Sequence, residues 1–307
     1  MAVQAMREYD ATHPDEIKLL EFKGAIFHES RVGSTLIANM LSSLPDARVY
    51  SESRPPVMAL NYACQKQSSD CTHDLVSEAV YMMRRVSRHN PARYMFWKLQ
   101  SAATWQLETF TRALPHIPWI FVYRDPVQVM VSHFQDAQKH NGPPKCAQRQ
   151  RNRPPPIVVK LLERYFDDQL SMYRGKQLAR AVSVEQYCAA HLASLTNTAI
   201  SVLQQSSQGR AVNYELLPDL LWNDLLTNHF QYNASDVEIA RMQEQARVYS
   251  KGGVGKTSKL DKVGIFENDS RRKEQAASTA IRSAAQGALQ ESYEQLEALS
   301  MHTRQDN

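Results

Sequence analysis

The sequence predicts an α/β protein built as a three-layer sandwich, with helices on both faces of a central parallel sheet. The first observation is a continuous apolar run at residues 119–123, typical of a strand that is buried on both faces. The second is the alternation of short strand-like runs with longer amphipathic stretches. No internal repeat or shift in composition marks a boundary, so we expect a single domain over residues 1–307.

The chain begins with a segment, residues 1–20, that we expect at the periphery of this domain. Charged side chains occur throughout it, so it is predicted to be neither a signal peptide nor a membrane anchor. No later run reaches the roughly 18 apolar residues that a membrane-spanning helix needs. These observations favour a cytoplasmic protein.

The first strand is predicted at residues 25–27, and a turn at residues 30–34 leads into a helix that begins at Thr35. Gly33 gives this turn room, because glycine has no Cβ to clash with the backbone. Apolar residues recur with helical spacing after Thr35, so this helix can cover one face of a sheet.

Strands and helices then alternate to the end of the chain. Asp125 followed by Pro126 is typical of a helix start, with a capping side chain and a proline in the first turn. Between residues 139 and 156 the chain holds five basic residues, five prolines and no acidic residue, which predicts an exposed basic loop. The other predicted strands are 47–50, 93–99 and 209–214, and the other predicted helices are 56–67, 74–89, 102–114, 157–173, 184–205, 216–226, 235–249 and 272–299.

Charge and cysteine content narrow the class of ligand. A net charge of +4 and a pI of about 8.8 are too mild to indicate nucleic acid as a partner, but they suit an anionic ligand. Cys64, Cys71, Cys146 and Cys188 show no C-x-x-C spacing, so no zinc site is expected. We predict reduced thiols, as is usual in the cytosol.

Residues 30–35 are the first candidate site. A strand that feeds a helix through a turn of this kind directs free backbone N–H groups and the positive end of the helix dipole at one point, where an anion can bind. The turn lacks the Gly-Lys of a Walker A loop, so it is not an ATPase loop of the usual kind. An ordinary turn without a ligand is the alternative.

Arg124 and Ser132 form the second candidate site. Arg124 follows the apolar strand at the edge where ligands bind in open α/β sheets, and Ser132 lies two helical turns further on. The alternatives are a salt bridge between Arg124 and Asp125, and a serine that faces water.

Together the two sites resemble the sulfotransferases that use 3′-phosphoadenosine 5′-phosphosulfate (PAPS). Their phosphosulfate loop, P-[KR]-S-G-[ST]-[ST], is similar to residues 30–35, and their R-D-P motif with a serine eight residues after the arginine is similar to residues 124–132. A stretch like their N-Y-E-x-L follows at residues 213–217. The resemblance covers about residues 24–260 and implies the P-loop-like sulfotransferase topology.

The resemblance also implies roles for individual residues. The loop would hold the 5′-phosphosulfate, Lys98 would lie near the bridging oxygen, and the second site would hold the 3′-phosphate. A late loop rich in glycine and lysine would cover the nucleotide, although a plain solvated loop is the alternative. The residues implied to bind the nucleotide are Arg31, Val32, Gly33, Ser34, Thr35, Arg124, Ser132, Tyr214, Lys251, Gly252 and Gly253.

The general base is implied by a second resemblance. Residues 98–100 lack the catalytic histidine of small-molecule sulfotransferases, whereas Glu52 stands 21 residues after Arg31, as the glutamate base does in protein-tyrosine sulfotransferases. Glu52 is therefore expected to be a buried base, with Arg31 and Lys98 as its catalytic partners. The alternative is that Glu52 pairs with Arg54 or Arg31 and only holds the loop. His28 and Glu29 are second-choice bases.

These residues predict a PAPS-dependent sulfotransferase that needs no metal. Its acceptor would be a hydroxyl group on a small molecule, a glycan or a peptide, and the basic loop would steer an acidic acceptor or remain a solvated face. Neither the acceptor nor the oligomeric state is specified by the sequence. The alternatives are a P-loop kinase-like phosphotransferase and a catalytically silent nucleotide-binding scaffold.

Overall fold

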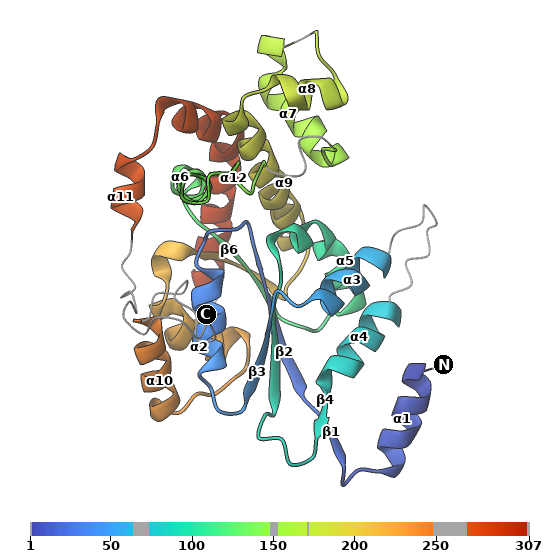
Figure 1. Cartoon of the computed structure of the whole chain (residues 1–307). Coiled ribbons are helices and arrows are strands. Elements are labelled where there is room, and N and C mark those ends of the chain that lie inside the picture. The colour runs from blue at the N-terminus through green and yellow to red at the C-terminus, as the bar shows by residue number, and fades with distance from the viewer. Residues whose placement is uncertain (1, 64–73, 148–152, 171, 248–268, 306–307) are drawn as a thin grey trace.

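A five-stranded parallel sheet lies at the centre of the protein (Figure 1). The computed structural model describes residues 2–63, 74–147, 153–170, 172–247 and 269–305. The strand order is β3-β5-β2-β6-β7, and every neighbouring pair is parallel. The strands are β2 (Glu21–His28), β3 (Ala47–Ser51), β5 (Tyr94–Lys98), β6 (Trp119–Tyr123) and β7 (Gly209–Asn213).

This strand order places a topological switch point between β2 and β6. From β2 the chain runs to β3 at one edge of the sheet, returns to β5 beside β2, and then crosses to β6 and β7 on the other side. The strands also end level with one another, since Ser51 pairs with Lys98 and Tyr123 pairs with Asn213. Residues that directly follow the strands are therefore brought together at one edge, where a crevice opens at the switch point.

Helices cover both faces of the sheet, which confirms the predicted fold class. In Figure 1, α2 (Ser34–Ser42) and α10 (Asp236–Ala246) lie on one side, and α3 (Arg54–Ala63), α4 (Asp74–Arg84) and α5 (Leu107–Ala113) lie on the other. Strand β2 shows how the sequence fits this arrangement. Ile26 is buried in the core beside α2, whereas Ala25 and Phe27 are buried in the core beside α3 and α4, as the alternation of side chains along a strand requires.

A further group of helices stands at the carboxyl edge of the sheet, at the top of Figure 1. Helix α9 packs along α12, and α6 and α7 pack against these two. The members of this group are α6 (Pro126–Lys139), α7 (Pro156–Leu170), α8 (Gly175–Ala181), α9 (Val184–Leu203), α11 (Ser270–Gln275) and α12 (Thr279–Gln305). The remaining elements are α1 (Ala2–Thr12), β1 (Ile17–Leu19), β4 (Arg85–Ser87), the 3₁₀ turns η1 (Ser101–Gln106) and η2 (Tyr214–Leu216), and the π-helix η3 (Leu221–His229).

The structure corrects several predicted helices. The helix predicted at residues 102–114 begins as the 3₁₀ turn η1, and the one predicted at residues 216–226 is replaced by η2 and the π-helix η3. The helix predicted at residues 74–89 ends at Arg84, and the next residues form β4, which pairs with β1 in a separate antiparallel sheet. The helix predicted at residues 272–299 is two helices, α11 and α12. The hydroxyl of Ser278 accepts a hydrogen bond from the backbone N–H of Ile281 at 3.2 Å, so α12 has its own capped start.

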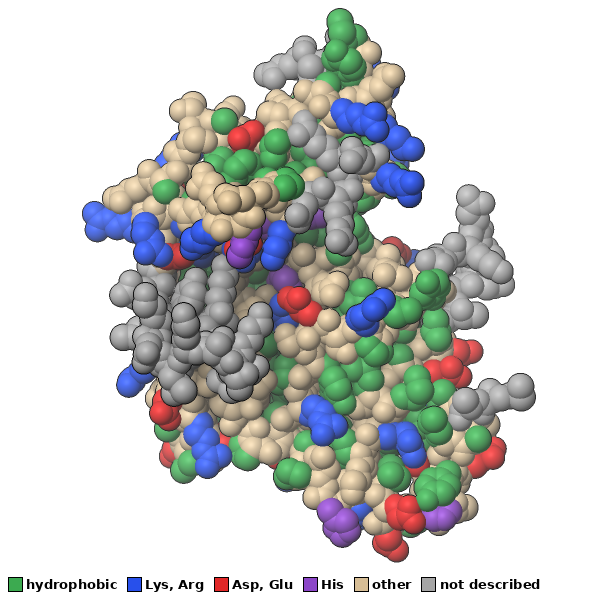
Figure 2. Space-filling view, viewed as in Figure 1, with side chains coloured by type: hydrophobic (Ala, Val, Ile, Leu, Met, Phe, Trp, Pro, Cys, Tyr) green, Lys and Arg blue, Asp and Glu red, His purple; other side chains and the backbone are tan. Residues whose placement is uncertain are grey.

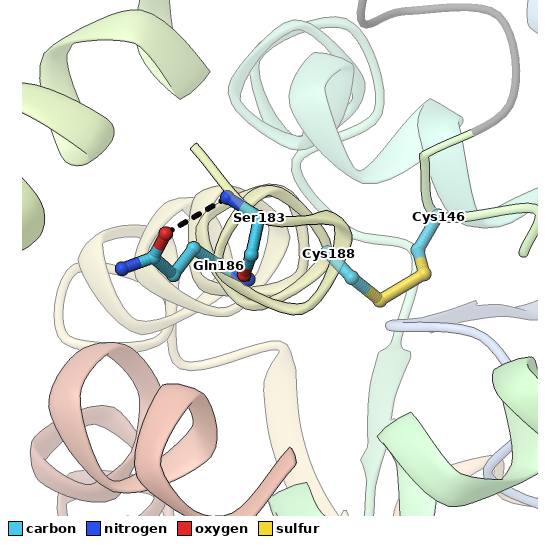
Figure 3. Close-up of a disulfide and its surroundings, with 4 residues drawn as sticks. All are labelled: Cys146, Ser183, Gln186 and Cys188. Atoms are coloured by element: carbon cyan, nitrogen blue, oxygen red, sulfur yellow. Dashed lines mark hydrogen bonds between the residues drawn. A yellow bond between two sulfur atoms is a disulfide. The ribbon is translucent and has the colours of Figure 1, made fainter. Parts of the chain in front are cut away.

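The prediction of reduced thiols is wrong for Cys146 and Cys188, which form a disulfide with Cα atoms 5.0 Å apart (Figure 3). This bond ties the basic loop to the first turns of α9, where Ser183 and Gln186 form a capping box. Cys64 and Cys71 lie outside the described residues. Within the described part of the chain, no helix is long and apolar enough to cross a membrane.

Candidate active site

A cavity of about 430 Å³ opens at the carboxyl edge of the sheet, beside the switch point. Every predicted site residue that the structure describes lines it. These residues are Arg31, Val32, Gly33, Ser34, Thr35, Glu52, Lys98, Arg124, Ser132 and Tyr214. Lys251, Gly252 and Gly253 lie outside the described residues. Segments that are far apart in the sequence thus meet in one cavity, because the site residues end or follow strands of the sheet or lie in the first two turns of the next helix.

The loop after β2 has a left-handed backbone, with φ of 88° at Ser30, 62° at Arg31 and 81° at Gly33. Such angles cost energy for residues other than glycine, so the surrounding structure must hold the loop in place. The backbone N–H of Ser30 donates to Nδ1 of His28 at 3.0 Å. The amides of Ser34 and Thr35 begin α2 and have no intrahelical acceptor, because the residues four positions back lie in the loop. The next two amides already donate to the backbone oxygen of Gly33. Together with the dipole of α2, the amides of Ser34 and Thr35 form a site for an anion.

Arg31 connects this loop to α6. Its guanidinium pairs with Asp136 at 2.8 Å and donates to the backbone oxygen of Ser132 at 3.4 Å. Its Nε is buried and has no hydrogen-bond partner among the described residues. A ligand that accepts hydrogen bonds could satisfy this nitrogen, whose burial without a partner is otherwise costly.

Lys98 and Glu52 form an ion pair across the ends of β5 and β3. The Lys98 side chain is 2% exposed and that of Glu52 is 51% exposed. Burial lowers the pKa of Lys98, and its hydrogen bond to Glu52 opposes this shift. Glu52 is therefore not buried as expected, and its partner is Lys98, not Arg54 or Arg31. The pair presents an ammonium and a carboxylate to the same cavity.

Arg124 is held on several sides. Its Nε donates to Gln128 at 2.7 Å, and its guanidinium lies over the ring of Tyr214 at 4.0 Å. Its acidic partner is Asp269, at 2.8 Å, and not Asp125 as the structural alternative required. Asp125 instead caps α6 by accepting from the backbone N–H of Gln128 at 3.0 Å, as the sequence predicted.

His28 and Glu29 are already engaged. Nδ1 of His28 accepts from Ser30, and its Nε2 bonds to the backbone oxygen of Leu99 at 2.9 Å. Burial lowers the pKa of His28 to about 3. Glu29 does not line the cavity and accepts from the backbone of Arg124 and from the hydroxyl of Thr196. Neither side chain is placed to take a proton from a ligand in the cavity.

Sequence reasoning missed other residues that line the cavity. Asp136 lies one turn beyond Ser132 on the same face of α6, and this spacing could have revealed it. His133 and His191 are buried on α6 and α9, and burial lowers their pKa values to about 3 and about 4. No sequence signal pointed to Asp269, which reaches Arg124 from a distant part of the chain.

The cavity carries a surplus of positive charge. Among the described residues that line it, seven are Lys or Arg and three are Asp or Glu. Figure 2 shows Lys and Arg side chains in a row from the left edge to the centre of this face, along the lower border of the upper helices. A cleft with this balance attracts anions and concentrates them near the loop. No group of three or more potential metal ligands occurs among the described residues.

No protein-family model matches the chain, and no curated protein is significantly similar to it. Among solved structures, the chain is similar to the sulfotransferase domain from the curacin biosynthetic pathway, with 10% identity and a TM-score of 0.44 over 88% of this chain and 98% of that one. It is also similar to the sulfotransferase domain from the Synechococcus PCC 7002 olefin synthase, with 11% identity and a TM-score of 0.42 over 92% and 95% of the two chains. A third similar structure is a sulfotransferase from Alicyclobacillus acidocaldarius, with 14% identity and a TM-score of 0.35 over 92% and 96%. At such low identities and TM-scores, these matches do not establish the activity of this chain.

Proposed function

We propose that the chain is a sulfotransferase that moves the sulfuryl group of PAPS to an acceptor hydroxyl. One observation carries this proposal: the loop that contains Arg31 and the pair Arg124 and Ser132 are distant in the sequence but line the same cavity. A ligand with anionic groups at two positions fits such an arrangement, because each position then has its own hydrogen-bond donors.

The 5′-phosphosulfate is assigned to the start of α2. The backbone N–H groups and hydroxyls of Ser34 and Thr35 and the guanidinium of Arg31 would hold it. Lys98 would neutralise the charge that develops on the bridging oxygen as the bond to sulfur breaks. The burial of Lys98 strengthens this role, because a charge acts more strongly where water is excluded.

Transfer needs a base for the proton of the acceptor. The acceptor oxygen forms a bond to sulfur while the bond between sulfur and the bridging oxygen breaks. The electron pair of that bond stays on the departing 3′-phosphoadenosine 5′-phosphate, and the acceptor proton passes to the carboxylate of Glu52. The hydrogen bond from Lys98 would hold this carboxylate at the cavity, and positioned proton transfer of this kind contributes about 10²–10⁴-fold to a rate.

The 3′-phosphate is assigned to Arg124 and Ser132. Both side chains are buried and line the cavity, and the ring of Tyr214 supports the guanidinium from one side. This second anionic position separates the proposal from the kinase alternative, since ATP has no 3′-phosphate.

Isothermal titration calorimetry with 3′-phosphoadenosine 5′-phosphate and with ATP tests this assignment. We expect the wild-type protein to prefer the bisphosphate, and Arg124→Ala to lose the preference. Arg112→Ala is the control, because Arg112 is exposed and pairs with Glu108 away from the cavity. Tighter binding of ATP would support the kinase alternative, and binding of neither nucleotide would refute the proposed function.

A further inference from the structure

Arg124 is paired with a carboxylate within the protein itself. The two oxygens of Asp269 accept from Nη2 of Arg124 at 2.8 Å and from Nζ of Lys273 at 3.0 Å. Nη2 of Arg124 also donates to the hydroxyl of Ser270 at 3.0 Å. Side chains of the segment that precedes and begins α11 therefore occupy donors that the proposed function assigns to the ligand.

The environment keeps this carboxylate ionised. The side chains of Arg124, Lys273 and Asp269 are 2%, 8% and 18% exposed. Burial alone raises the pKa of Asp269, but the hydrogen bonds from Arg124 and Lys273 outweigh it and hold the pKa below its usual range. Arg272 approaches the same carboxylate at 3.9 Å, so three cations surround one negative charge.

A phosphate that binds Arg124 meets Asp269. Two negative groups that share the same donors repel each other, so either the phosphate stays out or the carboxylate gives up its hydrogen bonds. A phosphate monoester carries close to two negative charges at neutral pH and offers three acceptor oxygens. It is therefore a stronger partner for Arg124 and Lys273 than a single carboxylate.

We propose that Asp269 is an internal competitor for the 3′-phosphate, which limits the affinity for this group and raises the rate at which the product nucleotide leaves. This inference rests on the proposed function. A ligand without a phosphate at this position does not displace Asp269 from Arg124, so its affinity does not depend on the carboxylate. After transfer, the carboxylate returns to Arg124 and Lys273 and speeds the release of 3′-phosphoadenosine 5′-phosphate.

The test compares wild type, Asp269→Asn and Asp269→Glu, with 3′-phosphoadenosine 5′-phosphate and adenosine 5′-monophosphate as probes. Removal of the charge should lower the Kd for the bisphosphate about tenfold, which corresponds to about 1.4 kcal/mol, and should slow its dissociation in stopped-flow measurements. The affinity for the monophosphate should not change. Asp269→Glu keeps the charge and should behave like wild type.

An unchanged affinity of Asp269→Asn for the bisphosphate would overturn the inference. A weaker affinity would overturn it too, and would make Asp269 a residue that positions Arg124. A structure of the wild-type protein with the bisphosphate gives a second readout that needs no variant. There, Asp269 should no longer bond to Arg124, and a retained 2.8 Å contact would overturn the inference. If wild type binds the bisphosphate and Arg124→Ala does not, the proposed function is supported, and this holds for any affinity that Asp269→Asn shows for the bisphosphate. If no variant binds it, both proposals fall.

Discussion

Replacement of Gly33 by alanine should damage both halves of the cavity at once. Gly33 has φ of 81°, and a Cβ built on it would lie 2.7 Å from Cδ2 and 2.9 Å from Cε2 of Tyr214. Tyr214 is 4% exposed, and its other contacts include the guanidinium of Arg124 at 4.0 Å. The ring cannot yield without changing its position relative to Arg124.

The magnitude follows from these contacts. A left-handed backbone costs an alanine about 1–2 kcal/mol, and an extra methyl group in a packed site costs typically about 1–3 kcal/mol. We therefore expect Gly33→Ala to lower the free energy of unfolding by about 2–5 kcal/mol. The displaced Tyr214 should weaken binding of 3′-phosphoadenosine 5′-phosphate at least about tenfold, which corresponds to about 1.4 kcal/mol.

Gly175→Ala is the matched control. Gly175 also has a positive φ, of 58°, but nothing lies within 4 Å of the Cβ built on it. It should lose only the backbone cost of about 1–2 kcal/mol and keep its affinity for the nucleotide. Urea unfolding and calorimetry measure both quantities. The reasoning is refuted if Gly33→Ala binds the nucleotide like wild type, or if Gly175→Ala loses binding to the same extent.

Two further predictions concern stability. Burial raises the pKa of Glu29 from 4.5 to about 8. Between these pH values the folded state therefore binds more protons than the unfolded state. The free energy of unfolding should fall as the pH rises through this window, by at most about 1.4 kcal/mol per pH unit. Glu29→Gln should flatten that slope in urea unfolding from pH 5 to 9, and an equal slope in both proteins would contradict the assignment. Cys146→Ser combined with Cys188→Ser opens a loop closed over 42 residues and should cost about 4 kcal/mol by the chain-entropy relation. If thermal unfolding does not change, the disulfide does not form in the protein.

The strands of the central sheet could be predicted because each contains a short stretch of apolar or β-branched residues, although β2 begins at Glu21, before the predicted strand at residues 25–27. The apolar run at residues 119–123 became β6, and residues 47–50 became β3 with one more residue. β4 could not be predicted, because it depends on pairing with β1, far away in the sequence. The helical pattern before it simply continues through Arg85.

Part of the candidate site could be predicted for a physical reason. Arg124 follows an apolar strand and was expected at the edge where ligands bind in open α/β sheets, whereas Lys98 and Glu52 were identified by the family resemblance. The three side chains converge because they end or follow parallel strands of one sheet. The sequence does not show which of these charged side chains pair with each other. Glu52 bonds to Lys98 and Arg124 to Asp269 because distant segments pack against each other, and no local pattern records this.

The disulfide escaped prediction for a similar reason. Cys146 and Cys188 are separated by 42 residues, and the first lies in a loop whose composition suggested exposure. The structure buries both side chains, at 2% and 0% exposure, where the loop meets α9. Spacing alone identifies a cysteine pair only in compact motifs.

A measurement of sulfuryl transfer from PAPS tests the proposed activity most directly. Wild type and Glu52→Gln would be incubated with PAPS and a mixture of small phenols, sugars and tyrosine peptides, and both products would be followed by mass spectrometry. We expect wild type to form 3′-phosphoadenosine 5′-phosphate and a sulfated acceptor in equal amounts, and Glu52→Gln to form them about 10²–10⁴-fold more slowly. PAPS that stays intact with every class of acceptor, or a Glu52→Gln variant as active as wild type, would contradict this expectation.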